Sequence, residues 1–365
     1  MLSSAAGLGY PSRGEKGLRQ VASTVRLCVK WFVGLALIAG LFWWYRDELS
    51  EIISQQFEWP WLAASVLVYF PSLLLTFYRW CLLVRAQELP FSTWHGFKLG
   101  FLGYLFSQVL PGSVTGDVVK AGMLARDQSR RTLAVATVIM DRIVGLFGLF
   151  LLAALLGVLF WHLVHDHTVL RILVIMVWLL AGFASLCLAA LAFLPVPVEP
   201  IAKWVSRLRF AGGFLVEMMR ACQLYRWHFR TVILALALSM VGHAGFVLSF
   251  YFSARAVPGP TPPLEAHYVF IPIGAVAQSV PLTPGNLGIN EGVFNSLYQA
   301  WDPALKAKGA LTSLAQRAVT WIVAAMVLGA YACLRGRRGP SGTFQANDRT
   351  PSPRALTASP GPSSK

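Results

Sequence analysis

The sequence predicts an all-α integral membrane protein in which six full spans and two re-entrant helical hairpins form an inverted repeat. Three observations favour this fold class. The chain of 365 residues is 56% hydrophobic and only 13% charged, a balance that excludes an ordinary soluble domain. Apolar runs of membrane-spanning length recur along it. Two shorter runs each end at a Pro-Gly pair, in the related segments LPGSVTGD at 110–117 and PGNLGINE at 284–291.

The apolar runs give the expected elements in order. A helix needs about 20 apolar residues to cross a bilayer, and the runs that approach or exceed this length are 27–45, 59–78, 132–161, 172–194, 231–253 and 309–334. Between them lie the shorter runs 99–110 and 266–282. At about 1.5 Å per residue the first of these reaches only about 18 Å. Proline and glycine break a membrane helix, and the freed backbone groups must face protein or a watery cavity. Each short run is therefore expected to turn back as a hairpin.

The charges between the runs orient the chain, because lysine and arginine accumulate on the cytoplasmic side. The basic leader 1–26 and the basic residues after the last span place both termini in the cytoplasm, which we expect for a multi-pass protein of the cell (inner) membrane. The first hairpin is flanked on both sides by basic residues: Arg79, Arg85, Lys98, Lys120, Arg126, Arg130 and Arg131. It should therefore enter from the cytoplasm, and the second hairpin, 266–300, from the exterior.

The two halves then match with opposite orientation, as a first repeat at 27–161 and a second at 172–334. Inverted repeats of this kind place a substrate near the middle of the bilayer. The weak point of this arrangement is that Lys306 and Lys308 lie outside, against the charge rule. If 266–282 crosses the membrane completely instead, the symmetry is lost.

Composition assigns the remaining segments. The first run, 27–45, is longer than a usual signal-peptide core and lacks a small-residue cleavage site, so it should be a retained span of a membrane domain at 27–335. The cytoplasmic linker 196–230 has apolar and basic positions at 201–225 that indicate either a helix on the cytoplasmic leaflet or a solvated linker. Pro, Ser, Gly and Thr in 336–365 predict a disordered cytoplasmic tail.

Charge and spacing argue against several functions. A net charge of +15 would suggest nucleic acid for a soluble protein, but here the basic residues lie between apolar runs, so no nucleic-acid partner is expected. The five cysteines lack CxxC spacing, and we expect neither a disulfide nor a metal site. No P-loop, G-x-S-x-G, HExxH or dinucleotide motif stands in a usable context, so neither a cofactor nor enzyme activity is expected.

The Pro-Gly breaks predict an anion site. The start of each returning half-helix carries unpaired N–H groups which, together with the helix dipole, attract anions. Gly112 and Gly116 in the first break, and Gly285 and Gly288 in the second, let the backbone turn and a ligand approach closely. These glycines, with Asn286 and the arginines described next, are the expected substrate-binding residues.

Arg142 and Arg317 each lie in the long apolar segment that follows a break. A charge at the centre of a membrane helix costs about 2.5–3.5 kcal/mol, so such residues are usually functional. The planar guanidinium suits a phosphate group. Alternatively, because 143–161 can span the bilayer alone, Arg142 lies near the headgroups and snorkels. His243, also inside a span, reads as a helix-contact residue rather than a proton relay.

The acidic residues near the breaks leave two interpretations open. Asp117 and Glu291 are placed to cap the returning half-helices. Alternatively, one or both bind a coupling cation or proton. Asp141 either neutralises the adjacent Arg142 or pairs across the bundle, and Glu291 is the natural partner of Arg317.

A set of motifs runs through the chain: Arg79-Trp80 with Leu82-Leu83, Pro111-Gly112 running into Gly116-Asp117, Asp141-Arg142, and Pro284-Gly285-Asn286-Leu287-Gly288 leading to Glu291. As a set they closely resemble the lysylphosphatidylglycerol synthase transmembrane-region family, also called flippase-like membrane proteins. The resemblance covers most of 25–335 and implies a lipid flippase module.

The function we expect is therefore the movement of a phospho-headgroup lipid, either a phospholipid or a polyprenyl-phosphate-linked lipid, between leaflets. The expected partner is membrane lipid with an anionic phosphate headgroup. Two alternatives are a membrane-embedded transferase acting on lipid-linked substrates and a scaffold subunit for a separate soluble lipid-modifying enzyme.

Overall fold

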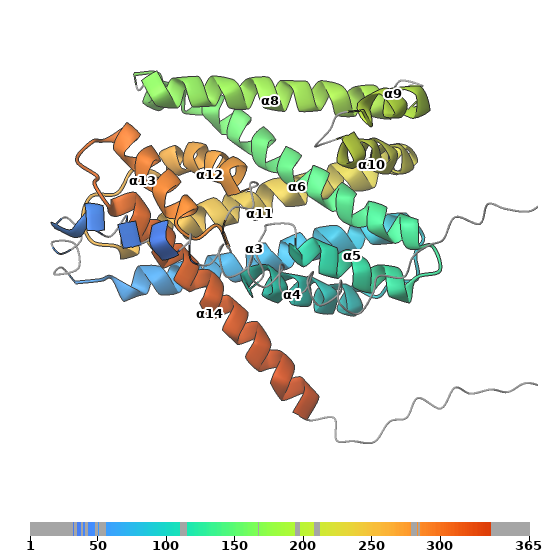
Figure 1. Cartoon of the computed structure of the whole chain (residues 1–365), viewed down its shortest axis with the longest axis horizontal. Helices are drawn as coiled ribbons and strands as arrows, with labels where there is room; N and C mark the ends of the chain where they lie inside the picture. Colours follow the sequence, from blue (N-terminus) through green and yellow to red (C-terminus); the bar gives the residue numbers. More distant parts are fainter. Residues whose placement is uncertain are drawn as a thin grey trace, which may run out of the picture. The chain divides into compact units, whose positions relative to one another are not determined.

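The computed structural model describes residues 56–109, 115–166, 168–193, 198–207, 212–278, 283 and 285–336, with parts of 32–50. The described residues are mostly helical (Figure 1). The predicted basic leader, much of the predicted span 27–45, the first Pro-Gly pair with Gly112, and the predicted tail lie outside the described residues.

The helices follow the predicted order: α3 (Trp59–Ala86), α4 (Thr93–Val109), α5 (Thr115–Asp127), α6 (Arg131–Leu159), α7 (Trp161–Val164), α8 (Thr168–Phe193), α9 (Val198–Val205), α10 (Gly212–Leu224), η1 (Arg226–His228), α11 (Phe229–Ala256), α12 (Leu264–Gln278), α13 (Ile289–Trp301) and α14 (Lys308–Gly336). In the described part of the chain, five segments are long and apolar enough to cross a membrane, namely α3, α6, most of α8, η1 with α11, and α14. The chain is thus an all-α, multi-pass membrane protein. Residues after Ala325 separate as a second compact unit, whose described part is the end of α14.

Two sets of helices have matching lengths. Helices α3 and α11 each have 28 residues, α4 and α12 have 17 and 15, α5 and α13 each have 13, and α6 and α14 each have 29. The order long, short, short, long is therefore used twice. The short helices are the arms of the two predicted hairpins, and α4 begins earlier than the predicted run, at Thr93.

The matched helices α3 and α11 run antiparallel to each other. At one end, the backbone N–H of Glu58 donates to the carbonyl of Ala256 at 3.0 Å. At the other end, Gln87 Nε2 donates to the carbonyl of Leu224, just before α11, at 3.2 Å. Gly245 permits close approach between them, since a Cβ there would lie 2.0 Å from Ser72 Oγ. The central pair therefore has the opposite chain directions that an inverted repeat requires.

The two hairpins open at opposite ends of this pair (Figure 1). After α5, Gln128 Nε2 donates to the carbonyl of Pro90 at 2.9 Å, which ties the open end of α4–α5 to the end of α3. After α13, Lys308 Nζ donates to the carbonyls of Pro258 at 2.9 Å and Gly259 at 3.1 Å, and to Val257, which ties the open end of α12–α13 to the end of α11.

Lys308 therefore differs from its prediction as an exterior loop charge. Lys308 is buried, only 2% exposed, and its Nζ donates to the carbonyls of the three residues that follow α11. A lysine whose three N–H groups all donate to backbone carbonyls stabilises the loop that it binds. Its position is then set by these bonds, so its charge does not indicate which side of the membrane the loop faces. Lys308 thus has a local structural role, whereas Lys306, the other residue of the predicted weak point, is exposed.

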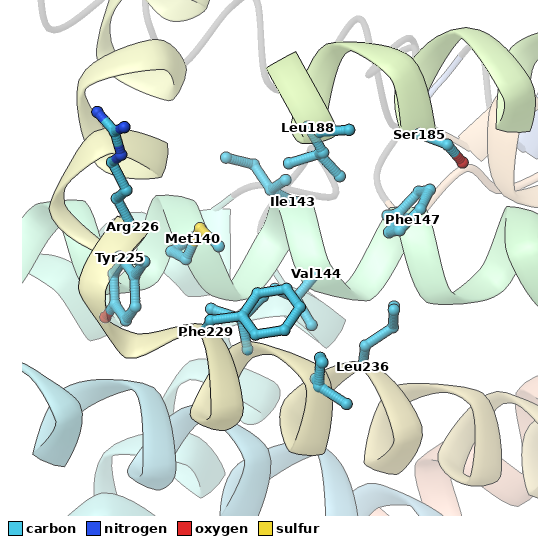
Figure 2. Close-up of a pocket in the computed structure, with 13 residues that line it drawn as sticks. Met140, Ile143, Val144, Phe147, Ser185, Leu188, Tyr225, Arg226, Phe229 and Leu236 are labelled. Carbon is cyan, nitrogen blue, oxygen red and sulfur yellow. The ribbon is translucent and has the colours of Figure 1, made fainter. Parts of the chain in front are cut away.

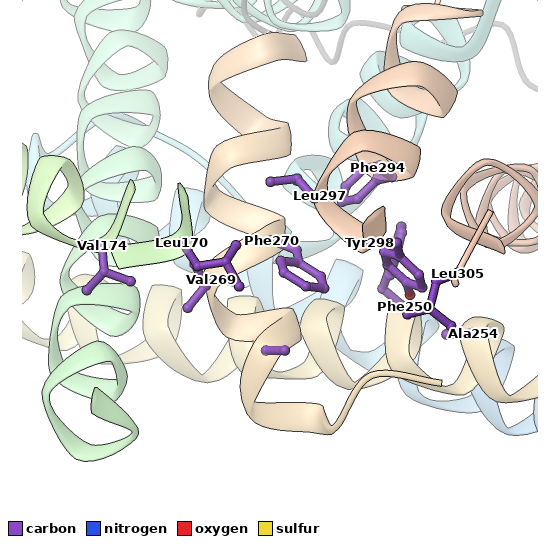
Figure 3. Packing of buried hydrophobic residues seen from close by; sticks show 11 residues of the cluster. Leu170, Val174, Phe250, Ala254, Val269, Phe270, Phe294, Leu297, Tyr298 and Leu305 are labelled. Carbon is purple, nitrogen blue, oxygen red and sulfur yellow. The ribbon is translucent and has the colours of Figure 1, made fainter. Parts of the chain in front are cut away.

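Packing between the helices produces an apolar pocket and a central core. The pocket lies between α6, α8 and α11 next to η1, with a volume of about 220 Å³ (Figure 2). The core joins α8, α11 and the second hairpin through large buried side chains, including Phe250, Phe270, Phe294 and Tyr298 (Figure 3). Phe250 and Phe294 have ring centroids only 4.5 Å apart. The predicted linker holds α9 and α10, which pack together through Ala202 and Val216.

Candidate functional site

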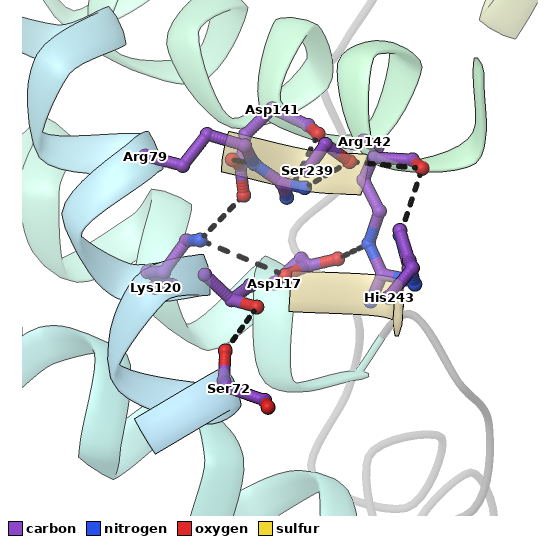
Figure 4. Close-up of polar contacts among 10 residues, drawn as sticks. Ser72, Arg79, Asp117, Lys120, Asp141, Arg142, Ser239 and His243 are labelled. Atoms are coloured by element: carbon purple, nitrogen blue, oxygen red, sulfur yellow. Dashed lines mark hydrogen bonds and ion pairs between the residues drawn. The ribbon is translucent and has the colours of Figure 1, made fainter. Parts of the chain in front are cut away.

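A network of charged side chains lies between α3, α5, α6 and α11 (Figure 4). Its centre is Asp141 on α6. Arg79 Nε of α3 lies 2.9 Å from one carboxylate oxygen of Asp141, and Lys120 Nζ of α5 lies 3.2 Å from the other. Arg79 and Lys120 are 5% and 6% exposed. Asp141 therefore pairs across the bundle, which was one of its two predicted roles.

This result corrects the prediction that Arg79 and Lys120 are loop charges that orient the chain. Both are buried because each has a carboxylate partner in the network. The sequence contained two signals. Arg79 is followed by the apolar run Trp80-Cys81-Leu82-Leu83-Val84, and Lys120 follows Asp117 by three residues, on the same helix face.

The other two guanidinium nitrogens of Arg79 and the ammonium of Lys120 make further contacts. Arg79 Nη1 donates to Ser239 Oγ at 2.9 Å and Nη2 to the Asp141 carbonyl at 3.2 Å. The Lys120 ammonium lies 4.1 Å from the centre of the Trp80 ring, a cation–π contact. A buried ion pair is stable only when its other hydrogen-bonding positions are satisfied in this way.

Arg142 points to the neighbouring carboxylate, Asp117 at the start of α5. Arg142 Nε and Asp117 Oδ2 form an ion pair, and Lys120 Nζ lies 4.0 Å from Asp117 Oδ1. The Arg142 side chain remains 42% exposed. The structure therefore brings together the residue expected to bind phosphate and the residue expected to cap the returning half-helix.

Next to this network is a cavity of about 250 Å³. The charged and titratable side chains that line it are Arg79, Tyr104, Asp117, Lys120, Asp141, Arg142 and His243. Three cationic side chains against two carboxylates leave one excess positive charge. Gly116, one of the expected substrate-binding residues, also lines the cavity. Such a site attracts an anion, and the arginine at its edge is chemically suited to phosphate.

His243 joins α11 to α6 beside this cavity. Its Nε2 donates to the carbonyl of Gly145 at 2.9 Å. Ser239, one turn earlier on α11, donates to the same carbonyl at 3.3 Å. His243 thus makes the helix contact that the sequence predicted.

The second half contains the predicted pair of Glu291 and Arg317. Glu291 is completely buried, and its Oε1 accepts from Arg317 Nη2 at 2.8 Å and Nε at 3.1 Å. The other oxygen accepts the backbone N–H of Gly288 at 2.7 Å, so Glu291 also caps α13. The predicted capping role and the predicted pairing with Arg317 are therefore both present.

The turn before α13 completes this closed arrangement. Gly285, Asn286 and Gly288 have φ values of 55°, 52° and 84°. Glycine adopts such values readily, and asparagine tolerates them better than most residues. Arg317 Nη1 donates to the carbonyl of Gly285 at 2.9 Å, and the Arg317 side chain is only 13% exposed. In the second half Arg317 and Gly285 therefore bind each other, and Gly288 binds Glu291.

The two halves can be compared position by position. Asp117 and Glu291 are each the third residue of their helix. They pair with arginines 25 and 26 residues later. The matching extends to the residues around each pair.

Three charged positions of the first half have neutral counterparts in the second. Arg79 and Ser249 are each the twenty-first residue of α3 and α11, and Lys120 and Phe294 are each the sixth residue of α5 and α13. Asp141 and Gln316 each precede the paired arginine. Gln316 Nε2 donates to Ser249 Oγ at 3.2 Å, in the place of the Arg79–Asp141 pair. The Phe250–Phe294 ring contact likewise replaces Trp80–Lys120.

Within the described residues, no group of three or more His, Cys, Asp or Glu side chains is placed to hold a metal ion. Comparison with protein families gives a match over most of the chain. The family model described as "Lysylphosphatidylglycerol synthase TM region" matches residues 31–329. Neither a curated protein nor a solved structure matches the chain.

Proposed function

The chain belongs to the lysylphosphatidylglycerol synthase transmembrane-region family, and from this membership we propose that it moves a lipid with a phosphate headgroup between the leaflets of the membrane. The observation that carries the proposal is the cavity beside Arg142, where three cations face two carboxylates. In this proposal the chain transports lipid without modifying it, and any modifying enzyme is a separate protein.

The geometry around Arg142 supports an exchange of partners. Arg142 uses Nε for Asp117, and its side chain is accessible from the cavity. A headgroup phosphate entering the cavity would compete with Asp117 for the guanidinium. A charge-assisted hydrogen bond to phosphate can replace one to carboxylate, because both partners are anionic oxygens. Lys120, whose Nζ lies 4.0 Å from Asp117 Oδ1, would remain beside the displaced carboxylate.

The unequal exposure of the two arginines supports alternating access. Arg142 is 42% exposed, whereas Arg317 is 13% exposed and engaged by Glu291 and Gly285. In this conformation the first hairpin would receive the headgroup and the second would be closed. Rocking one repeat against the other would exchange these roles, as in other transporters built from inverted repeats.

A flip assay in proteoliposomes tests this function. The probe is a fluorescent phosphatidylglycerol, and the readout is the fraction of probe protected from a membrane-impermeant quencher. Wild-type protein should accelerate equilibration between leaflets, and the Arg142→Ala, Arg317→Ala double variant should return it to the rate of protein-free liposomes. Arg142→Lys should retain part of the activity, because the charge remains.

The matched control is Arg126→Ala, which removes an exposed arginine of α5 outside the network. It should equilibrate the probe at the wild-type rate. Unchanged transport in the correctly inserted double variant would remove both arginines from the mechanism, and no transport by the wild type of any phosphate lipid would remove the proposed function.

A further inference from the structure

The apolar pocket between α6, α8 and α11 is separate from the polar cavity. Met140, Ile143 and Phe147 of α6 line the pocket, whereas Asp141 and Arg142 of the same helix line the polar cavity. The two spaces therefore lie on different faces of α6. A lipid whose headgroup occupies the polar cavity therefore does not explain why there is an apolar pocket on the other face.

The pocket is elongated along the helices. From α11 it is lined by Phe229, Val232, Ile233 and Leu236, which recur at intervals of three or four residues and so lie on one face. From Arg226 to Leu236 this face extends about 15 Å along the helix axis. Figure 2 labels Phe229 and Leu236 of α11 among the side chains of α6, α8 and α11 that line this space. Its volume of about 220 Å³ is below the 300–1,000 Å³ of drug-sized sites, which favours a single flexible chain.

One end of the pocket carries a positive charge. Arg226 of η1 lines it at that end, and no described carboxylate pairs with Arg226. Trp227 beside it is 85% exposed, as expected for an aromatic residue at the membrane interface. Exposed Arg85 and Arg230 lie at the same end of the α3–α11 pair. An arginine at the mouth of an apolar groove complements a lipid phosphate above an acyl chain.

We propose that this pocket binds one acyl chain of an anionic phospholipid, with the lipid phosphate held at Arg226. The bound lipid is a resident of this site and is distinct from any lipid in the polar cavity. Occupancy of the pocket therefore supports α6 on the face opposite to the one that carries Arg142.

Photolabelling tests this site directly. The protein is reconstituted in phosphatidylcholine liposomes with a trace of phosphatidylglycerol that bears a diazirine on one acyl chain, and labelled peptides are identified by mass spectrometry. Labels should fall on the pocket-lining stretches of α6, α8 and α11. Excess unlabelled phosphatidylglycerol should remove them, and excess phosphatidylcholine should not.

Two kinds of substitution test the contribution of the Arg226 charge and that of the apolar pocket to lipid binding separately. Arg226→Gln should lower pocket labelling about tenfold, the effect of losing a charge-assisted hydrogen bond, and Arg226→Lys should retain most of it. Ala189→Trp fills the groove from an exposed pocket-lining position and should abolish labelling. Leu186→Trp, on the same helix, exposed and outside the pocket, is the matched control and should label normally.

Two outcomes would overturn the proposal. Equal labelling by a phosphatidylcholine probe would show that any acyl chain enters, and labelling that persists in Ala189→Trp would show that the lipid lies elsewhere. The result is independent of the flip assay. Loss of transport in the arginine variants with normal labelling, or the reverse, identifies which proposal fails.

Discussion

Asp141 holds two cations at once, so each of the three side chains depends on the others. Arg79 and Lys120 approach different oxygens of the same carboxylate in a buried site. Replacing such a network by neutral groups of fitting shape is often harmless, whereas removing one member leaves an uncompensated buried charge. The second half of the chain shows what a neutral version looks like, with Ser249 and Gln316 in these positions.

We therefore predict that Arg79→Ser lowers the free energy of unfolding by about 3–5 kcal/mol. The double variant Arg79→Ser, Asp141→Gln should be more stable than the single variant, because it installs the neutral pair and leaves Lys120 near Asp117. Unfolding of the purified protein by denaturing detergent, followed by circular dichroism, measures both. Strictly additive losses would show that the two side chains are not coupled in this way.

For single residues, the sequence predicted an ion pair correctly where both partners follow the same Pro-Gly break. The Glu291–Arg317 pair was expected because both followed the same break and Arg317 has no acidic neighbour. The partners of Asp141 were not identified. Arg79 and Lys120 were assigned to loops because basic residues near span ends usually orient a membrane protein, and only the packing of α3 and α5 on α6 shows that they are buried.

Each hairpin closes where glycine allows its two helices to touch. In the first hairpin a Cβ on Gly116 would lie 2.2 Å from the carbonyl oxygen of Gly103. In the second, a Cβ on Gly274 would lie 2.5 Å from Cζ of Phe294. The first contact is to backbone, which cannot rotate away, so the spacing of α4 and α5 depends on Gly116.

Gly116→Ala should therefore separate α4 from α5 and displace Asp117, which is the next residue. We expect a loss of about 1–3 kcal/mol in stability, typical of overpacking, and reduced lipid transport. Gly122→Ala on the same helix is the control, because nothing lies within 4 Å of its Cβ. Thermal denaturation and the flip assay compare them, and equal behaviour of the two variants would contradict the close contact.

Helices were predictable from the sequence where a long apolar run defined them. The predicted runs 132–161 and 231–253 correspond to α6 and α11 within a few residues. The first residues of the short helices were harder to predict from the sequence. Helix α4 begins at Thr93, before the apolar run at 99, where Phe91, just ahead of the helix, and Leu99, in its second turn, both pack in the cluster around Trp80. Such contacts are tertiary and leave no periodic pattern in the local sequence.

Across the whole chain, the antiparallel α3–α11 pair and its two hairpins make a prediction about sidedness. The α3–α4 and α5–α6 loops lie at one end of the pair, and the α11–α12 and α13–α14 loops lie at the other. The first end is expected in the cytoplasm from its basic residues.

Single cysteines test this arrangement in a background where the five native cysteines are replaced by serine. Pro90→Cys and Ser129→Cys should react with an impermeant thiol reagent from the cytoplasmic side only. Pro260→Cys and Ala304→Cys should react from the opposite side only. All four positions are exposed. Labelling of all four from one side would exclude opposite entry of the hairpins.

The repeat itself was predictable because both copies kept a Pro-Gly break, an acidic residue and a later arginine. The difference between the copies was not. Ser249, Phe294 and Gln316 are ordinary residues of membrane helices, and nothing in the sequence marks them as counterparts of Arg79, Lys120 and Asp141 until contacts align the two halves.

The serines between α3 and α11 have a mechanical consequence. Ser65 Oγ lies 2.8 Å from Ser249 Oγ and 2.9 Å from Ser253 Oγ, and Ser253 donates to Gln316 Oε1 at 2.7 Å. Hydroxyl groups can rotate and exchange donor and acceptor roles. If α3 shifts along α11, these serines can therefore form nearly equivalent hydrogen bonds in the new position. Toward the other end, the planar guanidinium of Arg79 holds α3 to α6 and α11 through hydrogen bonds with a fixed geometry. If the two helices slip past one another, the slip should begin at the hydroxyl-rich end.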